Sequence, residues 1–392
     1  MGQLRDIKIL ELASVLAGPG VGQFFAELGA EVIKVENLKT AGDVTRSWKS
    51  PTEKTDDRSA YFCAVNWGKQ SIALDLATEE GREIVYKLAL SCDIVIASYK
   101  PGDAEKLGVD YTRLSKNHPG LIYGQITGYG SHNPRVGYDA IIQAEAGFMS
   151  MNGEPGGKSL KMPVALMDIL AGHQLKEGLL LALLEKVHTG KGKLVEVSLL
   201  QAAIASLANQ ATNFLLTQKL PQKQGSAHPN IAPYGDVFFT ADGKEILLAV
   251  GTDYQFGQLL NILNIGEISK DFRFKTNVLR VQNRASLNDH IAHAISGFQA
   301  VDLMASLNKS LVPAGLIRNV EEVLSEREAL PLLLSSGGLE GLKTYVANPD
   351  ENDNAHFLPP PRLGEHTVSI LKRLLNLSAN DIQSLFSKGI IV

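Results

Sequence analysis

The first 130 residues alternate short aliphatic runs with segments of helical periodicity. The aliphatic runs predict strands near residues 7–12, 31–36, 71–76, 93–98 and 121–126. Helices are expected between them, over residues 18–28, from Thr78 to about residue 91, and around residues 111–115. Short strands separated by helices are typical of parallel βαβ units, so we predict an α/β fold with a doubly wound, Rossmann-like sheet. Ligands of such sheets bind beyond the carboxyl ends of the strands.

The pattern changes near residue 220, where residues 221–229 have the composition of a linker. Beyond it, residues 236–243 and 244–250 predict two strands joined by an Asp-Gly turn, and helical segments follow to about residue 324. These features indicate a smaller α+β domain. Residues 325–358 are mixed, and Ser378 with Asp381 has the spacing of a capping box before a final helix. We therefore expect the first part of a large domain, a small domain and a return segment that completes the large domain, at residues 1–220, 221–325 and 326–392.

Asp168 is the only charged residue between Lys161 and Lys176. Burying an unpaired carboxylate is costly unless nearby groups compensate. Residues 169–187 are mostly good helix formers with a long apolar stretch, so Asp168 is expected where a buried helix starts. The free N–H groups and dipole of a helix start can hold such a carboxylate ionised. The local sequence favours an N-cap, and the alternative is a catalytic carboxylate.

Composition and charge exclude several classes of protein. The chain has 392 residues, 44% hydrophobic and 20% charged, as in a globular enzyme, and its net charge of −4 argues against nucleic acid and acidic membrane surfaces as partners. No apolar run approaches the roughly 20 residues that span a bilayer. Residues 1–6 lack the layout of a signal peptide, and the two cysteines form no disulfide framework. We expect a cytoplasmic protein.

Two familiar kinds of site are not favoured by the motifs. Gly18-Pro-Gly-Val-Gly22, with Glu36 after it, resembles a dinucleotide fingerprint, but Gln23 stands where the third glycine belongs. The histidines at 132, 173 and 228 are far apart and lack metal-ligand spacing, so no metal site is predicted.

Several stretches, taken in order, resemble the class III coenzyme A transferases, the group of the formyl-CoA and carnitine CoA transferases. The resemblance covers nearly the whole chain. The matching stretches are residues 15–19, 28–36, 66–75, 98–102, 137–139 with Gln143, Asp168, 189–192 with 197–198, 228–231, 313–315 and 360–367.

The resemblance implies that Asp168 is a covalent nucleophile. In this family the matching aspartate attacks an acyl-CoA thioester to form a mixed anhydride, which CoA thiolate converts to an aspartyl-CoA thioester. A second carboxylate then reverses these steps and leaves as a new CoA ester. The implied substrates are an acyl-CoA and a small carboxylic acid, with no tightly bound cofactor. The family also implies a homodimer whose two chains interlock.

The resemblance further implies a set of CoA-binding residues: Val15, Leu16, Ala17, Lys69, Ser98, Tyr99, Lys106, Leu107, Arg135 and Tyr138. Lys69, Lys106 and Arg135 would together form a cationic rim for phosphates. Gly251 and Thr252 match the loop that closes over the aspartate. Leu16 stands where formyl-CoA transferases have glutamine, and Gly251-Thr-Asp253 replaces their run of glycines. Both departures favour a substrate with some hydrocarbon over oxalate, either a short or branched carboxylic acid or a dicarboxylate with a methylene spacer.

Two other functions stay open at this point. The α-methylacyl-CoA racemases share the fold but pair their aspartate with a histidine in a Gly-His-Asp motif. Here the motif is Gly137-Tyr138-Asp139, and a tyrosine with an ordinary pKa near 10 is poorly suited to an imidazole's work. The remaining alternative is a CoA-binding protein without catalytic activity.

Overall fold

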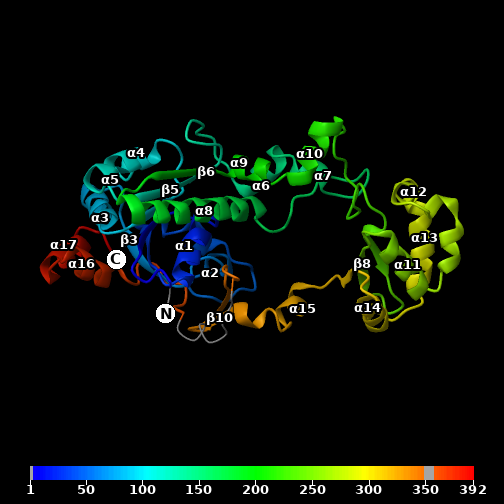
Figure 1. Cartoon of the computed structure of the whole chain (residues 1–392). Helices are drawn as coiled ribbons and strands as arrows, with labels where there is room; N and C mark the ends of the chain where they lie inside the picture. Colours follow the sequence, from blue (N-terminus) through cyan, green and yellow to red (C-terminus); the bar gives the residue numbers. More distant parts are fainter. Residues whose placement is uncertain (1–2, 348–356) are drawn as a thin grey trace. The chain divides into compact units, whose positions relative to one another are not determined.

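The computed structural model describes residues 3–347 and 357–392, which form two compact units (Figure 1). The first unit comprises residues 1–148, 161–215 and 327–392, within the described ranges, and the second comprises 149–160 and 216–326. Of the segment 325–358, residues 348–356 lie outside the described residues, as do residues 1 and 2 of the start considered above.

The first unit is built on a six-stranded parallel sheet. Its strands are β1 Lys8–Leu12, β2 Glu31–Asn37, β3 Lys69–Leu74, β4 Ile94–Ala97, β5 Ile122–Thr127 and β6 Leu194–Ser198. Their order is β3-β2-β1-β4-β5-β6, and every neighbouring pair is parallel. This is the doubly wound order, with its reversal between β1 and β4. The predicted fold class is confirmed, although β6 was not predicted.

Helices cover both faces of this sheet because successive strand residues point to opposite sides. On β1, Ile9 packs in the cluster formed with α1 Ala17–Glu27 and α8 Leu166–Thr189, whereas Leu10 packs in the other cluster. That second cluster holds side chains of α3 Glu79–Leu90, α5 Tyr111–Asn117, α16 Thr367–Leu375 and α17 Ala379–Ser387. Figure 1 shows α1 and α8 along one side of the sheet.

Shorter elements connect these parts. The helices are α2 Ala60–Cys63, α4 Asp103–Leu107, α6 Asp139–Glu145, α7 Phe148–Met151, α9 Leu199–Ala205 and α10 Ala208–Thr217, and the 3₁₀ turns are η1 Leu38–Thr40, η2 Val44–Ser47 and η5 Leu330–Leu332. The return segment adds a hairpin of β10 Leu333–Ser336 and β11 Leu339–Leu342. Among the described residues, no helix combines the length and the apolar content that crossing a membrane requires.

The second unit packs helices on an antiparallel sheet. Strands β7 Tyr234–Phe239 and β8 Glu245–Ala249 pair across the predicted turn, and β9 Ala314–Leu316, which was not predicted, joins β8. Its helices are α11 Asp253–Ile262, α12 Asn277–Gln282, α13 Arg284–Ile295, α14 Ala300–Lys309 and α15 Val320–Leu324, with turns η3 Gly266–Lys270 and η4 Phe272–Phe274. The α+β character of this part is as predicted.

A buried ionic network supports the loop after β1. Lys34 Nζ lies 3.0 Å from both Glu11 Oε1 and Asp43 Oδ2, and 2.8 Å from the carbonyl oxygen of Ala13. Asp43 in turn accepts a hydrogen bond from the backbone N–H of Val15 at 3.3 Å. These bonds compensate the cost of burying the charges. They also fix the loop that leads from β1 into α1.

Candidate active site

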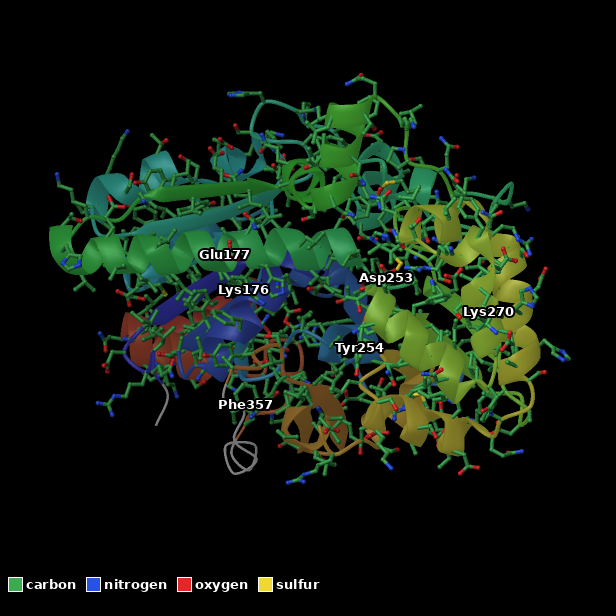
Figure 2. All side chains as sticks on the ribbon, turned by 45° about the vertical axis from the view of Figure 1, so that its right-hand side comes forward. Lys176, Glu177, Asp253, Tyr254, Lys270 and Phe357 are labelled. Atoms are coloured by element: carbon green, nitrogen blue, oxygen red, sulfur yellow. The ribbon has the colours of Figure 1, made fainter. Side chains whose placement is uncertain are left out.

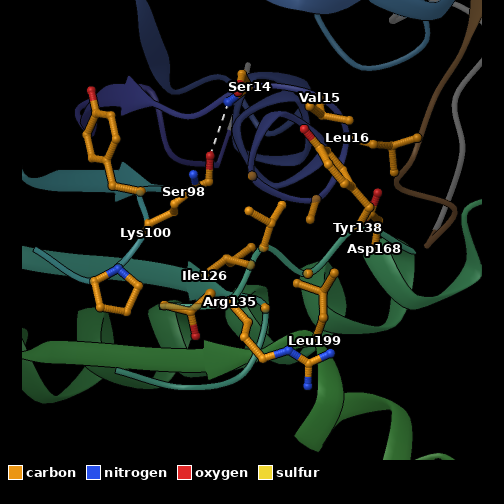
Figure 3. Close-up of a pocket in the computed structure, with 18 of the residues that line it drawn as sticks. Ser14, Val15, Leu16, Ser98, Lys100, Ile126, Arg135, Tyr138, Asp168 and Leu199 are labelled. Carbon is orange, nitrogen blue, oxygen red and sulfur yellow. Dashed lines mark hydrogen bonds between the residues drawn. The ribbon is translucent and has the colours of Figure 1, made fainter. Parts of the chain in front are cut away.

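A cavity of about 280 Å³ lies beyond the carboxyl ends of β1, β4 and β5, where the strand order reverses. We call it the strand-end cavity. It brings together eight of the predicted residues, which are Val15, Leu16, Ala17, Ser98, Tyr99, Arg135, Tyr138 and Asp168. Figure 3 shows Val15, Leu16, Tyr138 and Asp168 toward one end and Ser98 and Lys100 toward the other. This position is the one that the sheet topology predicts for a ligand.

The remaining predicted cations are elsewhere. Lys69 begins β3 and is fully buried, with Nζ 2.7 Å from Glu11 Oε2 and 2.9 Å from Asn66 Oδ1. Lys106 is exposed on α4 and pairs with Asp103 at 2.9 Å, and it lines none of the cavities described here. Of the three cations expected on one rim, only Arg135 lines the strand-end cavity. Burial of Lys69 in an ion pair is the physical reason for its departure.

Leu107 does not line the strand-end cavity. It lines a neighbouring cavity of about 210 Å³ whose wall also includes Ser98 and Tyr99. Gly251 and Thr252 belong to the second unit, just before the helix marked by Asp253 and Tyr254 in Figure 2. The Thr252 hydroxyl caps α11 by accepting from the N–H of Gln255, and the side chain of Gln255 accepts from the N–H of Gly251 and of Thr252. Their substrate role stays a prediction.

Asp168 is the third residue of α8 and not its N-cap. The N-cap is Ala165, and no side chain caps this helix. The local interpretation of Asp168 as a capping residue is therefore wrong, because the helix starts three residues earlier than expected. Only 8% of Asp168 is exposed, and no hydrogen bond to its carboxylate is found within the described residues. Burial, with a smaller contribution from the negative charge of Asp139, raises the pKa of Asp168 to about 7.

Asp139 and Gln143 hold the segment that leads into α8. Asp139 Oδ1 accepts from the backbone N–H of Met167 at 2.8 Å, and Oδ2 accepts from Gln143 Nε2 at 2.7 Å. Gln143 Oε1 accepts from the N–H of Met162 at 2.8 Å. Helix α6 is thus tied to the start of α8. The direction of the Asp168 side chain follows from this anchoring.

The loop between β1 and α1 carries local backbone strain. Val15 has φ of 73°, in the left-handed region that a β-branched residue rarely adopts. Its N–H faces the buried Asp43 carboxylate, which compensates part of the cost. Strain of this kind persists only where the surroundings determine it, and it concentrates at functional sites. Val15 and Leu16 both line the strand-end cavity beside Asp168.

A second cavity of about 620 Å³ shares Asp168 with the first. Its lining residues are Val15, Leu16, Trp48, Tyr61, Tyr138, Asp139, Ala140, Lys161, Pro163, Val164, Ala165 and Asp168. The carboxylate therefore borders both cavities. Trp48 and Tyr61 pack edge to face, with ring centroids 5.1 Å apart. Val15, Leu16 and Tyr138 also line both cavities, and Asp168 is the one acidic residue that the two linings share.

Sequence reasoning missed several lining residues. Lys100 follows β4 and lines the strand-end cavity, and its place after a strand is the signal that could have found it. Arg135, which was predicted, lines the same cavity, pairs with Glu145 at 2.5 Å, and stacks 4.3 Å above the ring of Tyr129. Trp48, Tyr61 and Lys161 come from separate segments, so no local pattern marks them. In the described ranges, no cluster of three His, Cys, Asp or Glu side chains could hold a metal ion.

Comparisons with known proteins identify the family. Residues 4–367 match CoA-transferase family III. The chain is 39% identical over 385 residues to the succinate–glutarate CoA-transferase of Agrobacterium fabrum, covering 95% of each chain. It is 36% identical over 400 residues to the succinyl-CoA:glutarate CoA-transferase of Mus musculus, covering 100% of this chain and 91% of that protein. A CaiB/BaiF family protein from Brucella suis matches with a TM-score of 0.84 and 40% identity, over 95% of this chain and 99% of its own.

The fold and its strand-end site define an α/β enzyme, and these matches make its class specific. The chain belongs to CoA-transferase family III, as its motifs indicated, and CoA transfer is the activity of its class. CoA thioesters and small carboxylic acids are the substrates of that class.

Proposed function

We propose that this enzyme moves CoA from succinyl-CoA, or a similar acyl-CoA, to a short dicarboxylic acid by way of Asp168. An oxygen of Asp168 attacks the thioester carbonyl, the C–S bond breaks, and CoA thiolate leaves a mixed anhydride. The thiolate then attacks the aspartyl carbonyl, which releases the first carboxylate and forms an aspartyl-CoA thioester. The acceptor carboxylate repeats both steps in reverse. Each step exchanges one activated acyl bond for another, so the free energy of thioester hydrolysis is retained in the product CoA ester.

One observation carries this proposal. The Asp168 carboxylate is buried, has no hydrogen-bond partner among the described residues, and belongs to the lining of two cavities. A carboxylate is a weak nucleophile in water because its charge is strongly hydrated. Asp168 has little water to lose, since only 8% of it is exposed. Its raised pKa makes the ionised form more basic than an exposed aspartate while leaving a large ionised fraction near neutral pH. These properties suit a group that must attack a thioester.

The strand-end cavity suits the CoA moiety. Its walls come from the loops after β1, β4 and β5, and its cations are Lys100 and Arg135. CoA carries phosphates, which favour cationic and backbone N–H partners. The thioester would then lie where this cavity meets the second one, at Asp168. Ser98, Tyr99 and Leu107 would contact the nucleotide part of CoA.

The acceptor is inferred from the second cavity and the relatives. The two relatives named above act on succinate or succinyl-CoA and on glutarate. Trp48, Leu16, Pro163 and Val164 give the second cavity apolar walls that fit methylene groups. Oxalate has no methylene group to bury there. A dicarboxylate of four or five carbons therefore fits the cavity better.

A racemase function is disfavoured by the groups around Asp168. Racemisation at an α-carbon needs two bases on opposite faces of that carbon. Tyr138 lines both cavities at the position of the racemase histidine, and no histidine lines either cavity within the described residues. A transferase needs only the one carboxylate. The site therefore supports transfer over racemisation.

We also propose that the enzyme acts as a homodimer, which the family resemblance implies. Leu181, Leu184 and Val187 of α8 are 63%, 59% and 80% exposed in the single chain. Their spacing places them along one side of the helix. An apolar stripe of this kind favours burial against another surface, and a second copy of the chain is the proposed partner.

The experiment is CoA exchange between succinyl-CoA and glutarate, followed by mass spectrometry of the CoA esters. The enzyme should form glutaryl-CoA, and Asp168→Asn should bind CoA but lose exchange by at least about 1,000-fold. A matched control is Asp93→Asn, an aspartate of the same unit that lies outside both cavities. Near wild-type exchange by Asp168→Asn would refute the mechanism. If the protein binds CoA but exchanges it with none of the acids tested, the non-catalytic alternative is favoured.

A further inference from the structure

The second cavity has few charged residues in its lining. Three of its lining residues are charged, namely Asp139, Lys161 and Asp168. Asp139 already accepts hydrogen bonds at both oxygens, from Met167 and Gln143. Asp168 is the proposed nucleophile. Lys161 is the one cation among these lining residues.

Lys161 is free to bind an anion. Its Nζ donates one hydrogen bond, to the carbonyl oxygen of Met162 at 3.1 Å, and it forms no ion pair with any described residue. An ammonium group has three donors, so two remain. Lys161 is exposed, which places it where the cavity opens to solvent. Its charge is therefore neither neutralised nor buried in the absence of ligand.

The surroundings of Lys161 separate its charge from the reacting carboxylate. Pro163, Val164 and Ala165 follow it along the chain and line the same cavity, and α8 begins one residue later. Trp48 and Tyr61 add aromatic surface. The cavity thus offers a carboxylate nucleophile, an apolar wall and one cation. A short dicarboxylate has the matching sequence of groups, namely a reacting carboxylate, methylenes and a distal carboxylate.

We propose that Lys161 binds the distal carboxylate of the dicarboxylate substrate and so determines the preference for dicarboxylates over monocarboxylates. This inference rests on the proposed function and assigns one of its specificity contacts. A charge-assisted contact at an open site strengthens binding of the correct acid, and a monocarboxylate of the same length leaves the ammonium unpaired. Lys161 touches the substrate at a distance from the reacting atoms. Its role is specificity and not bond making.

Arg135 shares the strand-end cavity with Asp168, as Lys100 does, and its contacts fit a different role. It lines the strand-end cavity but not the second cavity. Its guanidinium already pairs with Glu145 and stacks on Tyr129. An arginine already paired with a carboxylate has fewer free N–H donors and less uncompensated charge for a second carboxylate. The distal carboxylate is therefore assigned to Lys161.

The test compares glutarate with pentanoate, its monocarboxylate analogue of equal length. In a two-stage reaction through a covalent enzyme, kcat/KM for the acceptor reports only the second stage. Succinyl-CoA can therefore serve as the donor throughout, although it also carries a distal carboxylate. The variants are Lys161→Met, which keeps the length and removes the charge, and Lys161→Arg, which keeps the charge. Lys116→Met on α5, which lines neither cavity, is the control.

Lys161→Met should lower kcat/KM for glutarate by about 10-fold to 100-fold and change that for pentanoate by less than about threefold. Lys161→Arg should restore most of the preference, and Lys116→Met should match the wild type. Equal losses for both acids, or no loss for glutarate, would overturn the assignment. Failure of the proposed function is a separate result, since wild-type enzyme would then exchange no CoA, or Asp168→Asn would remain active.

Discussion

At the residue scale, Asp168 combines a catalytic advantage with a cost in stability. A carboxyl group whose pKa is higher in the folded protein than in the unfolded chain binds its proton more tightly when folded. For Asp168 these values are about 7 and 3.8. Ionisation of Asp168 therefore destabilises the folded state. The cost appears as pH rises above about 4 and is complete above about 7.

Asp168→Asn should consequently stabilise the protein at pH 8, because it removes a buried charge that lacks a hydrogen-bond partner. The difference between the two pKa values corresponds to at most about 4 kcal/mol. Urea denaturation of both proteins between pH 4 and pH 8 measures the effect. The difference in free energy of unfolding between Asp168→Asn and the wild type should increase with pH up to about 7 and fall toward zero near pH 4. A gap independent of pH would contradict the assigned ionisation.

The second prediction at this scale concerns Asp139, whose charge contributes to the raised pKa of Asp168. The exchange rate should fall as pH drops through about 7, because the nucleophile becomes protonated. Asp139→Asn removes the repelling charge and should move this acid limb to lower pH. Its amide oxygen can still accept from the N–H of Met167, so the start of α8 keeps that contact. Initial rates from pH 5 to pH 9 test this.

A purely structural role for Asp139 would give another result. The rate would then fall by the same factor at every pH, and the acid limb would stay in place. Burial is the larger cause of the raised pKa of Asp168, so the limb of Asp139→Asn should still lie above the range of an exposed aspartate.

At the element scale, the glycines of α1 have a packing role. A Cβ on Gly22 would lie 1.9 Å from Glu11 Oε2, inside the network of Glu11, Lys34 and Lys69. A Cβ on Gly18 would lie 2.5 Å from the Cβ of Ala13. These glycines therefore let α1 approach β1 closely. Close packing of α1 on β1 is therefore one reason for the glycines that resemble a dinucleotide fingerprint.

Gly22→Ala should destabilise the protein by about 3 kcal/mol or more, because the new methyl group displaces a buried, paired carboxylate. Gly20→Ala is the matched control two residues earlier in α1. Its Cβ would meet only Val65 Cγ1, at 3.8 Å, so the higher helix propensity of alanine should leave stability equal or raise it by up to about 1 kcal/mol. Chemical denaturation of both variants gives the values. Similar stabilities for the two would contradict this packing role.

The strands and helices of the doubly wound sheet were largely predictable because its buried strands are rich in aliphatic residues, even where Glu11 interrupts β1 and Lys34 interrupts β2. Strand β6 was missed because it lies at the sheet edge, where only Ser198 of its five residues is buried. Lys69 was misplaced because its partner Glu11 lies 58 positions away in the chain. The cavity containing Lys161 was not foreseeable, since Trp48, Tyr61 and Asp139 reach it from separate segments. Local sequence patterns predict helices and strands, whereas ion pairs between residues distant in the sequence can be identified only from the three-dimensional structure.

At the scale of the whole molecule, chain connectivity links the units more than once. Residues 149–160 belong to the second unit although they lie between two segments of the first. The sequence does not mark this excursion, because the segment has no strong periodicity. Its carboxyl-terminal end, Leu160, directly precedes Lys161.

The expected dimer is tested at this scale by sedimentation at micromolar concentration. The exposed apolar stripe of α8 predicts a dimer. Leu184→Glu places a charge in the stripe at a position 59% exposed in the single chain, so it should lower the yield of dimer on refolding from denaturant with little effect on the folding of the chain itself. If the two chains interlock, tagged and untagged wild-type dimers should exchange subunits only on the time scale of unfolding. A wild-type monomer, or a Leu184→Glu dimer of unchanged strength, would contradict the proposed interface.

If CoA is carried on Asp168 during transfer, chemical trapping should capture it there. Enzyme mixed with succinyl-CoA is quenched with hydroxylamine, which converts an activated aspartyl group to a hydroxamate, and its peptides are analysed by mass spectrometry. We expect a hydroxamate at Asp168 that requires succinyl-CoA and is absent from Asp168→Asn. Continued CoA exchange with Asp168 unmodified, or a hydroxamate at a different carboxylate, would contradict it.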